Sequence, residues 1–132
     1  MISRDIVLRV GRPTDNLEEI TNMYVDGLGF EIIGGFDNHG DFSGRMVGHP
    51  NHHYHLEFTS HAKEKAGRAP SLENLLVFYI PNDNEYKEAI DRISKSGFKK
   101  VNSFNPYWEG SAQTYEDLDG YRVVLNNAES PF

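Results

Sequence analysis

A short histidine-rich segment carries the side chains best suited to chemistry. Tyr54–Thr59 has the apolar and β-branched character of a strand, and every second side chain of a strand points to the same face. His53, His55 and Glu57 are therefore expected to project together. Imidazole and carboxylate groups at this spacing can bind a transition metal. Equally, the histidines can be neutral, hydrogen-bonded groups on a partly solvated strand.

Arginines on two other predicted strands are candidates for binding an anion. Arg9 lies on the predicted strand Asp5–Val10, where alternation places it on the same face as Asp5. A guanidinium binds carboxylates in a bidentate manner, which suits an anionic ligand. The alternative is a structural ion pair with an acidic neighbour such as Glu57. Arg122, on the last predicted strand, is a similar candidate with the same alternative.

Three aromatic residues are further candidates for lining a ligand pocket. Tyr79 lies on the predicted strand Leu75–Ile80, with a hydroxyl and a ring that a ligand could contact. Tyr107 and Trp108 lie in a proline-containing loop before a strand, where exposed aromatic pairs often line pockets. Trp108 could instead fill the core.

Length and composition predict one small globular domain in a reducing compartment. The 132 residues are enough for one core, and their net charge of -7 offers no basic surface for nucleic acid. Cysteine is absent, which excludes disulfides and thiolate chemistry. No signal-peptide or membrane-spanning pattern is visible, so we expect a soluble, cytoplasmic protein with no membrane partner.

The elements that must position these residues occur twice along the chain. Residues 4–60 read as a strand, a helix and three strands, residues 61–72 as a linking loop, and residues 73–127 as the same order again. Thr14 or Asp15 is expected to cap the first helix, and Asn82 or Asp83 the second. Gly11 and Pro13 are expected to stop the first strand.

Matching landmarks support this internal duplication. Pro13 and Pro81 are 68 residues apart, as are Gly29 and Gly97, each of which is followed by phenylalanine. We therefore predict a single α+β domain of two β-α-β-β-β modules. The modules would form a curved, cup-shaped mixed sheet with helices on its convex side, leaving a hollow for a small ligand.

Four sequence motifs resemble the vicinal oxygen chelate superfamily of glyoxalases, bleomycin-resistance proteins and extradiol dioxygenases. LRVGRPTDNLEEITNMYVDGLGFEII and HLEFT resemble its first module, and LLVFYIP and YEDLDGYRVVL resemble the opening and ending of its second. The resemblance covers nearly the whole chain. The run NPYW, together with LLVFYIP and DGYRVVL, is similar to the subfamily of YycE-like proteins.

The resemblance implies a divalent metal with up to four ligands facing the cup. The corresponding positions carry Asp5, Glu57, Leu75 and Val124. Only Glu57 is of the usual type, and Leu75 and Val124 cannot bind a metal. An altered set of Asp5, His55 and Glu57 could still hold Zn, Ni, Mn or Fe. Glu57 is then also the candidate catalytic residue.

These features lead to three functional hypotheses. The first is a cofactor-free protein that binds an anionic or aromatic small molecule in a cup lined by Arg9, Tyr79, Tyr107, Trp108 and Arg122. The second is a metal-dependent lyase, isomerase or dioxygenase of the glyoxalase type. The third is a dimeric interaction module with a vestigial cup. The resemblance also implies a homodimer.

Overall fold

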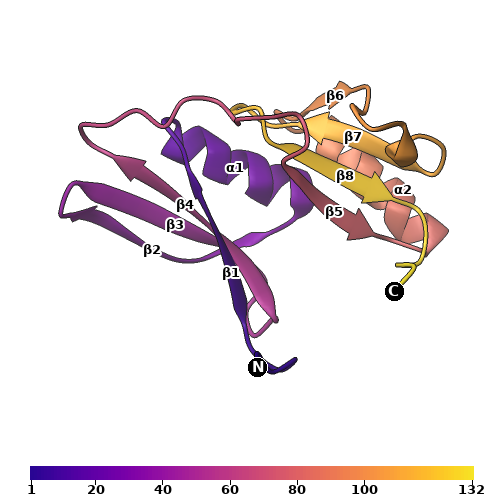
Figure 1. The fold of residues 1–132 in the computed structure, drawn as a ribbon, viewed down its shortest axis with the longest axis horizontal. Helices are drawn as coiled ribbons and strands as arrows, with labels where there is room; N and C mark the ends of the chain where they lie inside the picture. The colour runs from indigo at the N-terminus through magenta and orange to yellow at the C-terminus, as the bar shows by residue number, and fades with distance from the viewer.

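Two four-stranded mixed sheets, each carrying one helix, make up the fold (Figure 1). The computed structural model describes residues 1–132. The first half contains β1 (Leu8–Pro13), α1 (Leu17–Leu28), β2 (Glu31–His39), β3 (Phe42–Gly48) and β4 (Tyr54–His61). The second half contains β5 (Leu75–Tyr79), α2 (Asp83–Ser94), β6 (Lys99–Val101), the 3₁₀ helix η1 (Pro106–Trp108), β7 (Ala112–Glu116) and β8 (Arg122–Asn126). The predicted α+β class and the repeated β-α-β-β-β order are confirmed.

Both sheets have the same strand order. The first runs β1-β4-β3-β2 and the second β5-β8-β7-β6. In each sheet the outer pair, β1 with β4 or β5 with β8, is parallel, and the other pairs are antiparallel. No strand of one sheet pairs with a strand of the other. β1 and β5 are therefore edge strands within the single chain.

The first strand begins and ends later than its sequence predicts. β1 covers Leu8–Pro13 rather than Asp5–Val10, and Asp5 lies in a turn before it. Gly11 and Pro13 do not stop the strand because β1 has a neighbour on one side only, and a proline is tolerated on an edge strand. The later start does not change which side chains share a face, so Arg9 and Gly11 lie on the same side of β1.

Local hydrogen bonds explain where the helices begin. Asn82 caps α2 by accepting the Glu85 N–H at 2.9 Å, as predicted. The prediction that Thr14 or Asp15 caps α1 is wrong, because Asn16 occupies the cap position, and its side chain makes no capping bond to the helix. The Asp15 carboxylate instead accepts the backbone N–H groups of Ala66 and Gly67, at 2.8 and 3.0 Å, and so anchors the linking loop. Neither helix is long and apolar enough to cross a membrane.

One core joins the two modules on the helix side of both sheets. Tyr24 of α1 is fully buried between Phe58 of the first sheet and Phe98 of the second module, with ring centroids 4.9 and 5.1 Å away. α1 and α2 contact each other beside these rings. The opposite face of the first sheet, which we call the open face, is left without a covering helix (Figure 1).

A buried polar cluster, which we call the latch, also connects the modules. The Tyr24 hydroxyl donates to Asp117 Oδ2 at 2.7 Å and accepts from Arg12 at 3.4 Å. Beside them, Asn16 donates to Asp119 at 3.0 Å. Arg12, Asn16 and Tyr24 belong to the first module and the two aspartates to the second. The latch therefore fixes how the modules sit against each other.

Candidate functional site

Arg9, His55 and Glu57 meet on the open face of the first sheet. Arg9 lies directly beside His55 in the parallel β1–β4 pair, and Gly11 lies beside Glu57. The Arg9 Nε–H donates to His55 Nε2 at 2.9 Å, and its NH1 donates to Glu57 Oε2 at 3.4 Å. The predicted alternation is confirmed for these three residues, because they contact one another away from the helices. We call this group the Arg9 cluster.

In the Arg9 cluster, the guanidinium is held in place but still has N–H donors without a partner. A guanidinium has five N–H donors, and only two hydrogen bonds from Arg9 are present. The Arg9 side chain is 49% exposed and that of Glu57 17% exposed, so the remaining donors can reach a ligand from solvent. His55 Nε2 accepts the hydrogen bond from Arg9, so in this arrangement Nε2 carries no proton of its own and the imidazole adds no charge.

Glycines keep the surface around the cluster free of bulky side chains. A Cβ placed on Gly11 would meet no atom within 4 Å, so this position beside Glu57 faces open space. Gly48, the β3 residue opposite His55, also lacks a side chain, but it packs closely against His55, where an added Cβ would lie 3.0 Å from the His55 Cβ. A small ligand can therefore approach Arg9 and Glu57 without displacing protein atoms.

The residues implied as metal ligands do not form a metal centre. Asp5 lies in the turn before β1 and contacts Ser3 through its backbone N–H, with no bond to His55 or Glu57. No group of three or more His, Cys, Asp or Glu side chains lies close enough to hold a metal ion. Val124, at the fourth implied position, is fully buried as well as chemically inert. The residues present therefore do not fit the metal group that the resemblance implies.

The remaining predicted ligand-binding residues lie on the second module and do not join the Arg9 cluster. Arg122 is 7% exposed, and its guanidinium donates to Glu116 at 3.1 Å and to the Asn102 carbonyl at 3.2 Å. These contacts favour the structural alternative for Arg122. Tyr107 is 68% exposed and contacts Trp108 edge-on in η1, with ring centroids 4.9 Å apart.

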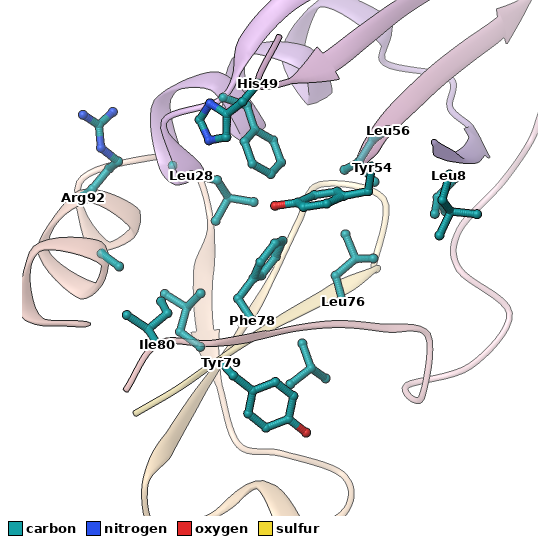
Figure 2. Close-up of a pocket in the computed structure, with 16 residues that line it drawn as sticks. Leu8, Leu28, His49, Tyr54, Leu56, Leu76, Phe78, Tyr79, Ile80 and Arg92 are labelled. Carbon is teal, nitrogen blue, oxygen red and sulfur yellow. The ribbon is translucent and has the colours of Figure 1, made fainter. Parts of the chain in front are cut away.

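Tyr79 is the last residue of β5. In Figure 2 its ring points away from the rings of Phe78 and Tyr54. No hydrogen bond joins its hydroxyl to another residue. One chain alone therefore does not gather the five predicted ligand-binding residues into one cup.

The structure contains a cavity that the sequence did not predict. It measures about 620 Å³ and lies between the modules on the helix side, with mostly hydrophobic walls (Figure 2). Alternation places Tyr54 and Leu56 opposite the Arg9 cluster, which was a usable signal for their orientation. The cavity itself depends on how the modules pack, which no local pattern encodes. Its lining residues belong to α1, α2, β4 and β5, among others.

Paired β-α-β-β-β modules with helices on one face define the vicinal oxygen chelate fold. The chain is similar in structure to a mutant of the fosfomycin resistance protein FosX from Listeria monocytogenes, with a TM-score of 0.74 and 14% sequence identity. The match covers 98% of this chain and 95% of that one. Glyoxalase I of Leishmania major matches 92% of the chain with a TM-score of 0.70, 18% identity and 85% of its own length covered. At these identities the likeness shows the fold alone.

Closer relatives identify the family. The model of the YycE-like N-terminal domain matches residues 8–59, and that of the YycE-like C-terminal domain matches residues 73–127. The YycE protein of Bacillus subtilis (strain 168) is 39% identical over 122 residues, covering 92% of this chain and 88% of that protein. A crystal structure of B. subtilis YycE has a TM-score of 0.87 at 38% identity, covering 96% of this chain and 93% of that one. The chain belongs to the YycE-like family.

Proposed function

We propose that this protein binds a small anionic compound on the open face of its first sheet, with Arg9 as the main contact. The observation that carries the proposal is the geometry of Arg9, whose guanidinium is held by His55 and Glu57 while half of the side chain remains exposed. A guanidinium fixed in this way loses less conformational freedom when it binds an oxyanion than a freely rotating one.

The surroundings of Arg9 support an oxyanion of modest size. Gly11 leaves open space on the strand that carries Arg9, and His55 adds no negative charge. Glu57 is the only carboxylate that pairs with Arg9. The Listeria FosX structure was obtained with Mn(II) and a phosphonic acid. A simple phosphonate is therefore a reasonable first probe for a protein with the same fold.

Calorimetric titration with methylphosphonate, inorganic phosphate and acetate tests this proposal. Arg9→Gln removes the charge and is expected to weaken binding of the preferred anion by at least about tenfold, since a charged hydrogen bond contributes ~1.5–3 kcal/mol. Arg4→Gln is the matched control, because Arg4 is exposed, lies outside the Arg9 cluster and loses the same charge. Equal losses in the two variants, or no saturable binding to the wild type, would contradict the proposal.

A metal-dependent enzyme is the second candidate, and one observation favours it. His55 and Glu57 lie on the same open face and both approach Arg9, so two potential ligands are already together. A tight transition-metal site needs at least one more protein ligand, which the chain does not bring to this position. We therefore place anion binding first.

We also propose that two copies pair, as the family resemblance implies. β1 and β5 each have a hydrogen-bonded neighbour on one side only. Apolar residues just before the start of β1 are exposed, among them Ile6 and Val7. An apolar edge strand is a surface that a second strand can cover. A homodimer would bury these residues, and the open face would remain the ligand-binding surface.

A further inference from the structure

We infer that the cavity between the modules is a second ligand site, which takes a neutral, flat aromatic compound carrying one polar group. This site is separate from the Arg9 cluster, because the two lie on opposite faces of the first sheet. The cavity volume of about 620 Å³ falls within the range of pockets that bind small molecules. Its walls come from both modules, so the ligand would contact α1, α2 and both sheets together.

Three aromatic rings from different parts of the chain determine which ligand shape fits the cavity. Phe30 follows α1, Tyr54 opens β4 and Phe78 lies in β5. Their ring centroids are 6.2 to 6.5 Å apart, and the rings are tilted by 49° to 66° to one another. These separations lie at the wide end of aromatic contacts, so ring surface stays available to a ligand. Figure 2 shows the rings of Tyr54 and Phe78 close to each other among the residues that line the cavity.

The Tyr54 hydroxyl supplies the polar contact. It has no hydrogen-bond partner within the protein, and in Figure 2 it points toward the interior of the cavity near Leu28. Burial raises the pKa of Tyr54 above its usual value of 10.0, so the phenol stays protonated and can donate. An apolar ligand with one hydrogen-bond acceptor, such as a phenol or a ketone oxygen, would complete this bond.

The charges at the rim favour a neutral ligand over an anionic one. Arg92 is the only cationic side chain among the lining residues, and its guanidinium turns away from the cavity (Figure 2). Arg92 donates to the Asp26 carbonyl at 3.3 Å and lies beside the acidic side chains of Asp26, Glu88 and Asp91. His49 packs edge-on against Phe30, with ring centroids 5.4 Å apart. No free positive charge therefore faces the interior.

Fluorescence titration of the full chain with N-phenyl-1-naphthylamine, a neutral aromatic probe, tests this site. The wild type should bind it saturably with one probe per chain. Leu8→Trp replaces a lining leucine with a large ring that takes up space in the cavity. The probe should then bind at least about tenfold more weakly, because less of its apolar surface can be buried. Leu72→Trp is the matched control, since Leu72 is also a half-exposed leucine but does not line the cavity.

Competition between two ligands of similar size tests the role of Tyr54. 1-Naphthol should displace the probe about 2- to 10-fold more effectively than 1-methylnaphthalene, which lacks the hydroxyl. Tyr54→Phe should abolish this preference while leaving 1-methylnaphthalene unaffected. Arg9→Gln should change none of these values, which separates this site from the proposed anion site.

Three results would overturn the inference: no saturable binding of the probe, equal losses in Leu8→Trp and Leu72→Trp, or an unchanged preference in Tyr54→Phe. A fourth concerns a second copy of the chain as occupant. If a second copy fills the cavity, probe binding would fall as protein concentration rises and sedimentation shows dimers forming. That result would assign the cavity to a subunit interface.

Discussion

At the scale of single residues, Arg9 is held by one neutral and one charged neighbour, and the two act differently on a bound anion. His55 orients the guanidinium without adding charge, whereas Glu57 both orients it and repels an anion. Two unit charges a few Å apart in a solvated environment interact with about 1 kcal/mol, which is a factor of roughly five in affinity. The charge of Glu57 therefore limits how tightly the site can bind.

Glu57→Gln separates the two functional hypotheses. The glutamine oxygen can still accept from Arg9, so the loss of negative charge should strengthen methylphosphonate binding by roughly 2- to 5-fold. A metal site would behave in the opposite way, because losing a carboxylate ligand weakens cation binding. Calorimetry with methylphosphonate, and separately with Zn²⁺ and Mn²⁺, measures both. Stoichiometric metal binding by the wild type that disappears in this variant would favour the enzyme hypothesis.

At the scale of elements, the latch between the modules is expected to carry much of the stability of their contact. Tyr24→Phe removes the hydroxyl that joins Asp117 to Arg12 and leaves both buried groups without this partner. We expect the free energy of unfolding to fall by about 1–3 kcal/mol. Urea unfolding measures the change. Tyr86→Phe is the control, since the Tyr86 hydroxyl makes no hydrogen bond, and an equal loss there would contradict a specific role for the latch.

The latch also predicts how stability responds to acid. Burial raises the pKa of Asp117 above 3.8, against the opposing hydrogen bonds from Tyr24 and two backbone N–H groups. The folded state therefore holds this proton more tightly than the unfolded state. The resulting stabilisation is complete below pH 3.8 and is lost as the pH rises through the folded pKa.

Comparison with Asp117→Asn isolates this effect, because other acidic groups such as Asp15 are common to both proteins. As the pH is lowered through the window just above 3.8, the wild type should gain free energy of unfolding relative to the variant. Urea unfolding over a pH series provides the values. A difference that stays constant, or that shrinks on acidification, would show that Asp117 does not titrate in this way.

The elements themselves were largely predictable from sequence, for reasons that are visible at particular residues. Alternation correctly placed Arg9, His55 and Glu57 on one face, because strand geometry fixes which side chains share a side. The predicted start of β1 was wrong. The β-branched residues Ile6 and Val7 favour a strand, but the pairing of β1 with β4 begins only at Leu8. The cap of α1 was misassigned, because Asp15 binds a loop distant in sequence.

At the scale of the whole molecule, local sequence patterns did not predict how the two modules are arranged relative to each other. The repeat of Pro13 and Pro81 predicted two similar units but not the distance between their sheets. That distance follows from the contact of α1 with α2 and from the latch, both of which join residues far apart in sequence. The separated sheets explain why Tyr107 and Arg122 do not join Arg9 within one chain.

The proposed homodimer is testable through the exposed edge of the first sheet. Val7→Lys places a charge beside β1, and a lysine at a sheet edge disfavours pairing with another strand. Sedimentation velocity should show a dimer for the wild type and a shift toward monomer for this variant. Leu118→Lys, at an exposed leucine between β7 and β8, is the matched control and should remain dimeric. A monomeric wild type would contradict pairing.

Resonances of the Arg9 side chain report most directly on the proposed function. In an NMR titration of ¹⁵N-labelled protein with methylphosphonate, the Arg9 Nε–H signal should shift and saturate together with the backbone amides of Gly11 and Glu57. Signals from the cavity residues Phe30 and Phe78 should stay in place. Shifts that leave the Arg9 signal unmoved while other arginines respond would show that the anion binds elsewhere, and that the open face of the first sheet is not the ligand-binding surface.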